Sequence, residues 1–305
     1  MEVALAAATP VANNDTATTA EDTAVQIDVL ANDSDADGDS LSILSAVVSG
    51  SGTGTVTTDG STITFTPAAD YNGTATVFYF ASDNNDGADS ASVTVTITEV
   101  NDRPVANADT GTITEDDGAT TFAVLTNDTD IESDSLFVSL PSITSGDTSG
   151  TVTSNGTTVT YTPSADFYGT TVISYTITDD GTTNGSDDFL NATGTLTVTV
   201  TEVNDAPVAI ADTATIAEDA TATSFTVLGN DTDTESGTLT VSSPTIASGD
   251  TSGTVTTNGT TVTYTPSADF NGATVINYTI TDNGTTNGAN DFLTDIATLT
   301  VTVTE

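Results

Sequence analysis

Apolar and polar residues alternate along most of the chain, and threonine and valine dominate the alternating segments. Residues 94–98 (TVTIT) and 196–200 (LTVTV) are two examples. Alternation with period two places successive side chains on opposite faces of a strand, and β-branched residues favour strands. Helical spacing of the apolar residues is absent. The pattern therefore predicts an all-β protein with valine facing inward and threonine outward.

The strand pattern occurs three times. Glu115 and Glu218 stand 103 positions apart, as do Pro163 and Pro266, and the second and third copies match without a gap. The first copy fits the same frame but is shorter in its last loop. About seven strands per copy suit an immunoglobulin-like sandwich. We expect three tandem seven-stranded immunoglobulin-like β-sandwiches over residues 1–100, 101–203 and 204–305.

The chain direction in such a sandwich predicts the overall shape. An odd number of strands puts the two ends of each sandwich at opposite poles, so tandem copies stack end to end as an elongated rod. Within each copy, an Asp-Gly or Asn-Gly pair separates two strand segments, at Asp59, Asn155 and Asn258. These pairs predict tight hairpins with type I′ turns.

Composition excludes several classes of function. The formal net charge is −43, and the single basic residue is Arg103, so nucleic acid and anionic membranes are poor partners. The absence of Cys, His and Lys removes disulfides, thiolate nucleophiles, Ser-His-Asp triads and the usual zinc ligands. No segment reaches the ~18 to 20 apolar residues of a membrane-spanning helix, so we expect no membrane insertion. These exclusions leave oxygen-based sites for hard cations, and we expect no enzyme.

The acidic residues gather where neighbouring sandwiches meet. In an up-and-down order of seven strands, the first and fifth connections lie at the C-terminal pole, and the second and sixth lie at the N-terminal pole. The first junction then collects Glu21, Asp22, Asp70, Asn101, Asp102, Asp128, Asp130 and Asp179. The second junction collects Glu115, Asp116, Asp166, Asn204, Asp205, Asp231, Asp233 and Asp282.

This oxygen-rich set of side chains favours calcium. Carboxylates crowded in this way repel one another strongly without counter-ions. Calcium takes six to eight oxygen ligands in flexible geometry, whereas magnesium demands a tighter octahedron and keeps several waters. We therefore expect calcium at both junctions. General surface acidity that serves solubility or salt adaptation is the alternative, and so is a turn-capping role for Asp70 and Asp166.

Some of these motifs resemble those of a known family. Glu21, residues 32–35 (NDSD), Asp70 and the linker 101–104 (NDRP) look like the calcium motifs of cadherin repeats, most nearly the bacterial cadherin-like tandem repeats of large extracellular adhesins. The resemblance implies an extracellular or cell-surface location. It also implies calcium-binding roles for Glu21, Asp70, Asn101, Asp102, Asp128 and Asp130. The linker departs from the cadherin pattern because it lacks one Asn, which implies fewer ions at each junction.

Two acidic poles have no neighbouring sandwich in this chain. The N-terminal pole carries Asp33, Asp35 and Asp83, and the C-terminal pole carries Glu218, Asp219 and Asp269. In the first copy, Asp33 and Asp35 open an alternating acidic array that resembles a calcium loop. We expect a calcium-stiffened spacer, or a subunit that associates head to tail with another copy or with further repeats. The alternative is an adhesin region that recognises a glycan, ice or a surface receptor.

Overall fold

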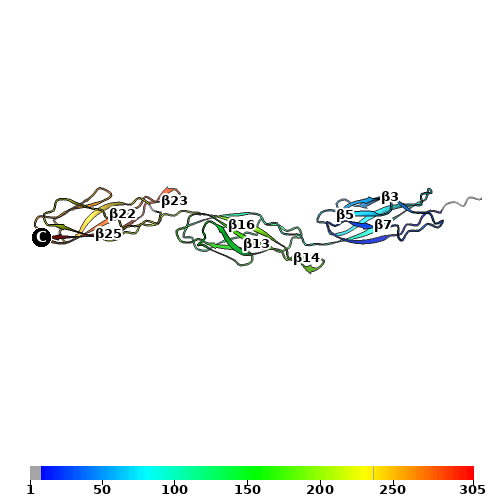
Figure 1. Cartoon of the computed structure of the whole chain (residues 1–305), viewed down its shortest axis with the longest axis horizontal. Helices are drawn as coiled ribbons and strands as arrows, with labels where there is room; N and C mark the ends of the chain where they lie inside the picture. Colours follow the sequence, from blue (N-terminus) through cyan, green and yellow to red (C-terminus); the bar gives the residue numbers. More distant parts are fainter. Residues whose placement is uncertain (1–7, 236) are drawn as a thin grey trace, which may run out of the picture.

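The computed structural model describes residues 8–235 and 237–305, and these residues form strands, turns and loops without a helix. Three sandwiches follow one another along an elongated chain (Figure 1). The predicted all-β fold, with three tandem immunoglobulin/cadherin-like domains, is confirmed. The alternation of threonine with apolar residues accounts for it, because each strand buries one face and exposes the other.

The first repeat consists of a four-stranded sheet facing a three-stranded sheet, with strand orders β1-β7-β6-β3 and β2-β5-β4. Strand β1 runs parallel to β7, and the remaining pairs are antiparallel. The strands are β1 Asp15–Ala20, β2 Val25–Ile27, β3 Ser42–Ser49, β4 Gly54–Thr58, β5 Ile63–Pro67, β6 Gly73–Ser82 and β7 Ala88–Thr98.

The second repeat has the same two sheets and adds a two-stranded hairpin, β14-β15, in the connection before its last strand. This hairpin fills the loop that is shorter in the first repeat. The strands are β8 Asp109–Thr114, β9 Thr120–Phe122, β10 Phe137–Ser145, β11 Thr151–Ser154, β12 Val159–Thr162, β13 Gly169–Thr178, β14 Thr182–Thr183, β15 Ser186–Asp187 and β16 Asn191–Thr201.

The third repeat matches the second strand for strand, including the added hairpin, β23-β24. Each of these two repeats therefore has the seven expected strands plus two short ones. The strands are β17 Asp212–Ala217, β18 Thr223–Phe225, β19 Thr240–Ser248, β20 Thr254–Thr257, β21 Val262–Thr265, β22 Gly272–Thr281, β23 Thr285–Thr286, β24 Ala289–Asn290 and β25 Thr294–Thr304.

Each repeat has its own apolar core between the two sheets. In the first repeat, Val77, Val93 and Val95 are fully buried, whereas the intervening threonines face outward. Burial of each such side chain contributes about 1.5 to 3 kcal/mol. A tyrosine also lies in each core, and its hydroxyl donates to carboxylates at the N-terminal pole, as Tyr79 does to Asp33. The core thus stabilises the sandwich and also orients polar groups at one pole.

The turn between the paired segments of each hairpin differs from the expected type. A type I′ turn requires positive φ at both central residues, but only the glycine has it, with φ of 91° at Gly60 and 93° at Gly259. The preceding Asn258 instead accepts the N–H groups of Thr260 and Thr261 through its side-chain oxygen. The hairpins are present as predicted, and the type I′ assignment is wrong because this local side-chain capping holds the turn.

Candidate metal centre

A first acidic cluster lies between the first and second repeats. Oxygen atoms of Asp22, Asp70 and Asp102 lie within 4.8 Å of one another. Asp22 and Asp70 come from two turns at the C-terminal pole of the first repeat, and Asp102 comes from the linker. Both turn residues have left-handed backbone conformations, with φ of 54° and 55°, and the Asp70 N–H donates to Asp22 Oδ1 over 3.3 Å. Three separate chain segments thus converge on one point.

A second acidic cluster faces the linker from the N-terminal pole of the second repeat. Oxygen atoms of Asp130, Glu132 and Asp134 lie within 4.8 Å of one another. Asp130 Oδ1 accepts the N–H groups of Glu132 and Asp134, both over 3.1 Å, and these bonds hold the loop in place. The Asp102 N–H donates to Glu132 Oε2 over 3.3 Å. Asp102 therefore connects the two clusters through the linker.

Asn101 fixes the linker against the second repeat. Its Nδ2 donates to Asp179 Oδ1 over 3.1 Å and to the Asp188 carbonyl over 2.6 Å, so its Oδ1 points the opposite way. Asn101 and Asp179 are both buried. A methyl group at Gly181 would overlap Asn101 Oδ1 and the Asp134 carboxylate, so only glycine allows this approach.

Many buried oxygen atoms at the two junctions have no hydrogen-bond donor among the described residues. An unsatisfied buried polar atom costs about 1 to 3 kcal/mol, and native structures contain few of them. A divalent cation would satisfy several at once. The atoms are Glu21 Oε2, Asn101 Oδ1, Asp102 Oδ2, Asp130 Oδ2 and Asp179 Oδ2 at the first junction, and Asn204 Oδ1, Asp205 Oδ2, Asp233 Oδ1 and Glu235 Oε2 at the second.

Electrostatics at the junctions also favours a cation. Burial raises the pKa of Asp102, and the nearby charges of Asp70 and Asp22 raise it further. Burial likewise raises the pKa of Glu21, against the opposing effect of a hydrogen bond from the Val100 N–H, and the charge of Asp102 adds to the increase. The folded chain therefore holds these groups in surroundings that penalise their negative charge. The chain's one basic residue, Arg103, donates to the Asn191 carbonyl.

The second junction repeats most of this arrangement. Asp116, Asp166 and Asp205 form a cluster equivalent to the first one, with oxygen atoms within 4.8 Å of one another. Asn204 Nδ2 donates to Asp282 over 3.1 Å, and the Asp205 N–H donates to Glu235 over 3.2 Å. Glu115 accepts the Val203 N–H, as Glu21 accepts that of Val100. The alternating acidic array beside this junction has one acidic residue fewer, because Gly237 occupies the position of Asp134.

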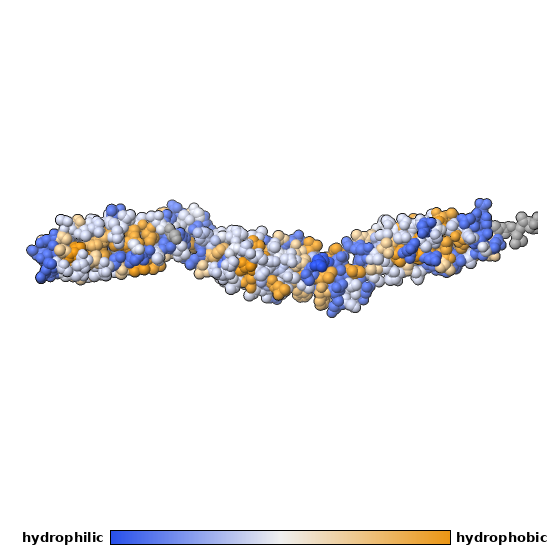
Figure 2. Space-filling model, in the orientation of Figure 1, coloured by the Kyte–Doolittle hydropathy of each residue, from blue (hydrophilic) through white to orange (hydrophobic). Residues whose placement is uncertain are grey.

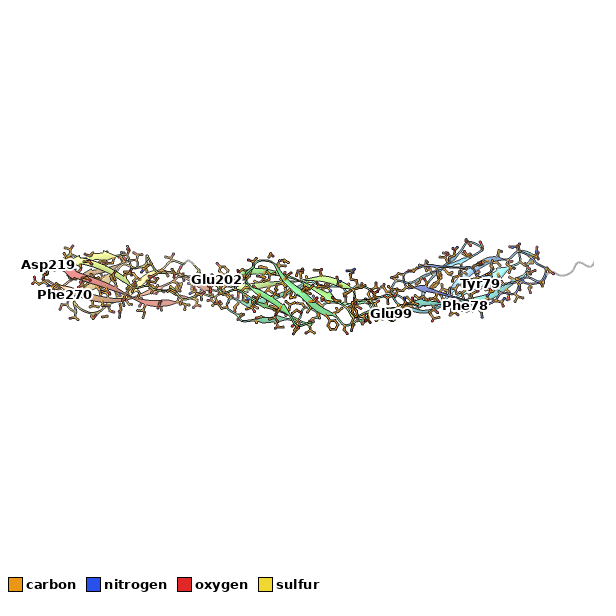
Figure 3. All side chains as sticks on the ribbon, turned by 60° about the horizontal axis from the view of Figure 1, so that its bottom comes forward. Phe78, Tyr79, Glu99, Glu202, Asp219 and Phe270 are labelled. Atoms are coloured by element: carbon orange, nitrogen blue, oxygen red, sulfur yellow. The ribbon has the colours of Figure 1, made fainter. Side chains whose placement is uncertain are left out.

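The hairpins added in the second and third repeats contact the linkers. Thr183 Oγ1 accepts the Asn101 N–H over 2.9 Å, and the Asn184 N–H donates to the Glu99 carbonyl over 3.3 Å. The third repeat has the same pair of contacts, from Thr286 to Asn204 and from Asn287 to Glu202. Figure 1 shows β14 and β23 beside the junctions, and Figure 3 labels Glu99 and Glu202 there. Each junction therefore has direct protein contacts as well as acidic clusters.

Not every predicted residue reaches these two clusters. Asp128 lies within its own repeat, where its Oδ1 accepts the Asn107 N–H over 2.8 Å, and burial together with the charge of Asp109 raises its pKa. Asp231 is placed in the same way, accepting the Ile210 N–H. Asp33 accepts the hydroxyl of Tyr79. The first acid of the Asn-Asp-x-Asp motif therefore accepts hydrogen bonds from groups of its own repeat, and none of the three bonds involves the linker.

Three acidic residues near the linkers were missed by the sequence analysis, namely Glu132, Asp134 and Glu235. The signal was available, because the alternating acids of the first repeat recur as Asp128, Asp130, Glu132 and Asp134 in the second. When a loop folds around the carboxylate of one acid, as this loop does around Asp130, acids at every second position can point toward the same centre. Recurrence of this array, rather than its spacing in one copy, is the informative feature.

Solved structures with similar folds are cadherin ectodomains. Mouse cadherin-23 EC22-24 matches with a TM-score of 0.63 and 18% identity over 97% of this chain and 99% of that one. Protocadherin gamma B2 extracellular cadherin domains 1-5 match with a TM-score of 0.60 and 17% identity over 97% of this chain and 60% of that one. Human CDH23 EC21-23 matches with a TM-score of 0.59 and 17% identity over 96% of this chain and the whole of that one.

A family model assigns the chain at the level of sequence. The model described as a bacterial Ig domain matches residues 7–96, 101–201 and 204–304. The chain therefore belongs to the bacterial Ig domain family, as three tandem members. No curated protein sequence matches it significantly. Among the described residues, no helix is long and apolar enough to cross a membrane.

Proposed function

We propose that the chain is an extracellular adhesion-type repeat region in which calcium ions at the two junctions hold the three sandwiches in a rigid rod. The observation that carries this proposal is the convergence of buried oxygens without donors from two repeats and their linker. Its role is mechanical, as a spacer that projects or connects other parts outside the cell. The likeness of the linker motif to that of cadherin repeats supports the same function.

The donor set fits calcium better than other ions. The site offers carboxylates and one amide oxygen, and calcium accepts six to eight such ligands in flexible geometry. At the first junction, Glu21, Asp22, Asp70 and Asp102 would hold an ion on the side of the first repeat. Asn101, Asp102, Asp130 and Asp179 would hold an ion on the side of the second. Asp102 belongs to both sets and would tie the repeats together through the linker.

The proposal extends to association between chains. At the N-terminal pole of the first repeat, Asp83 is only 2% exposed, and its Oδ2 has no donor among the described residues. Asp35 Oδ2 is likewise buried and has no donor among the described residues. At the opposite end, Asp219 Oδ1 accepts the Asp269 N–H over 3.2 Å, as Asp22 accepts that of Asp70, and Figure 3 labels Asp219 there. Two such poles could share an ion head to tail, as the internal junctions would.

Isothermal titration with calcium, on the full chain after removal of metal by a chelator, tests the junction sites. We expect saturable binding that is reduced by about half in each of the single variants D102N and D205N, and almost abolished in the double variant. The matched control is D187N, which changes an exposed acid outside these contacts and leaves binding unchanged. Absence of saturable binding, or full binding in the double variant, would contradict the proposal.

A further inference from the structure

The outer face of the larger sheet in the first repeat is apolar where β3 meets β6. Val47 is 55% exposed, and Phe78 and Phe80 are each 44% exposed. Val47 lies opposite Phe78 in the strand pairing, and Ser45 lies opposite Phe80. Apolar residues are visible on the surface of this repeat in Figure 2, and Figure 3 labels Phe78 on it. Large side chains left in water in this way often mark an interaction site.

The positions equivalent to Val47, Phe78 and Phe80 are polar in the other two repeats. The buried tyrosines Tyr79, Tyr175 and Tyr278 align the three copies, so Phe78 corresponds to Ser174 and Asn277. Val47 corresponds to Ser142 and Thr245, which lie opposite those two residues in their own sheets. Sandwich stability does not require the apolar residues, because two of the three repeats fold without them.

The edge of this sheet is also different in the first repeat. Strand β3 is the last strand of its sheet, and its pairing with β6 is unbroken from Ser45 to Ser49. Within the described part of the chain, no hydrogen bond outside that pairing involves the backbone of residues 45–49. An edge strand presents unpaired N–H and C=O groups and can pair with another chain.

The corresponding edges of the second and third repeats are protected. Pro141 lies inside β10 and Pro244 inside β19, and the strand register shifts at both places. The residue before each proline, Leu140 or Ser243, has a φ of 48°. Proline and bulges are the devices by which sheet edges avoid pairing with other chains. The first repeat also shifts register, between Ile43 and Ser45, but it lacks the proline and keeps a five-residue regular edge beyond the shift.

We propose that β3 pairs antiparallel with β3 of a second copy of this chain, about a two-fold axis at Val47. The two four-stranded sheets would become one sheet of eight strands. Val47 would face the partner's Val47, which extends the row begun by Phe78 across both copies. Residues opposite each other on one face of an antiparallel pair lie about 4.5 to 5.5 Å apart between Cβ atoms, so these side chains would be in contact.

Charge restricts a second copy to this face of the first repeat. The chain carries a net charge of −43, so two copies repel over most of their surfaces. The outward-facing rows at this edge of the sheet contain no charged side chain; they are Ser45-Phe80-Ser90, Val47-Phe78-Ser92 and Ser49-Thr76-Thr94. Identical edges related by a two-fold axis are self-complementary, as closed dimers require. This lateral contact is independent of the proposed calcium sites at the poles.

Sedimentation equilibrium of the full chain across a concentration series tests the pairing. We expect a dimer that persists when calcium is chelated, and a dissociation constant raised at least roughly tenfold in V47K, where two like charges would face each other. F78S, which copies the second repeat, should weaken the dimer in the same direction. T245K at the matched position of the third repeat should leave it unchanged. A monomer at all concentrations, or a dimer unaffected by V47K, would overturn the proposal.

A cross-link tests the geometry directly. The chain contains no cysteine, so V47C introduces one thiol for each copy. A disulfide needs Cα atoms about 4.4 to 6.8 Å apart, a range that includes directly opposed strand residues. Mild oxidation should convert V47C to a covalent dimer, whereas T245C should remain monomeric. Equal cross-linking of both variants would indicate random collision and would also overturn the proposal.

Discussion

Two sets of buried aspartates in this chain have opposite surroundings. Asp147 and Asp250 are each 3% exposed inside the second and third repeats, and Asp250 accepts five donors, from Ser252, Gly253, Tyr264 and both the N–H and hydroxyl of Ser267. Asp179 at the first junction is as deeply buried, but its Oδ2 has no donor in the described structure. Burial alone therefore does not distinguish the proposed metal sites; burial without donors does.

The pKa values follow the same division. Burial by itself raises the pKa of Asp250, but the hydrogen bonds from Ser267 and Tyr264 outweigh it and lower the pKa to about 2. At the second junction, burial and the charges of Asp116 and Asp166 raise the pKa of Asp205. The protein stabilises the charge of Asp250 with its own donors, whereas burial and like charges destabilise the charge of Asp205, which belongs to the proposed cation site.

The largest expected effect comes from removing a fully satisfied carboxylate. D250A leaves five donors without an acceptor in a buried site, and each costs about 1 to 3 kcal/mol where water cannot replace the acceptor. We expect the third repeat to lose about 3 kcal/mol or more of its free energy of unfolding, equally with calcium and with chelator. Urea denaturation in both conditions measures it. A loss seen only with calcium would show that Asp250 acts through a metal.

The first repeat shows how this carboxylate can be replaced. Pro67 and Tyr79 both align with the third repeat at a step of 199, which places Ser51, Phe65 and Ala68 at the positions of Asp250, Tyr264 and Ser267. Replacing both partners of a buried hydrogen bond costs less than removing one. We expect the triple variant D250S/Y264F/S267A to be about 1 to 2 kcal/mol more stable than D250S alone in urea denaturation. Equal or lower stability of the triple variant would contradict the pairing of these three positions.

A smaller effect is expected at the first junction. D102N keeps the size of the side chain but removes one charge shared by both proposed ion positions. Calcium affinity at that junction should fall about tenfold or more, which corresponds to about 1.4 kcal/mol. With chelator present, D102N should be as stable as the original chain or slightly more so, because like-charge repulsion falls. Thermal melts with and without calcium check both statements, and a loss of stability in chelator would count against them.

The smallest effect is a difference in pH dependence. The folded state lowers the pKa of Asp250 to about 2, so its carboxylate stabilises the fold fully above the pKa of the unfolded chain, which is about 4. This stabilisation is lost as the pH falls from about 4 to about 2. The raised pKa values of Asp102 and Asp205 have the opposite sign, because the folded metal-free chain binds more protons than the unfolded one. The free energy of unfolding of the chelated chain should therefore increase as the pH falls from neutral to about 5.

Calcium should reverse that slope, because protons compete with the ion for the same carboxylates. Thermal midpoints measured from pH 7 to pH 5 should rise in chelator and fall in calcium. Parallel slopes in the two conditions would contradict a role for these carboxylates in binding an ion.

The fold could be predicted from the sequence because the alternation of valine and threonine repeats three times in one frame. The convergence of Asp22, Asp70 and Asp102 could also be predicted, since it follows from which strand connections share a pole. Two other features of the site could not be predicted from the sequence. Tertiary hydrogen bonds direct Asp128 toward its own repeat, and the contact of the 182–187 hairpin with Asn101 depends on its path in three dimensions. Sequence spacing contains neither kind of information.

Small-angle X-ray scattering, recorded with calcium and with chelator, tests the central claim most directly. The V47K variant should be used so that lateral pairing does not contribute. The account predicts the scattering of a single extended rod in calcium, and a broader distribution of bent shapes in chelator. D102N/D205N should scatter like the chelated chain in both conditions. Identical profiles with and without calcium, together with an unchanged thermal midpoint, would contradict the claim that divalent cations stiffen the junctions.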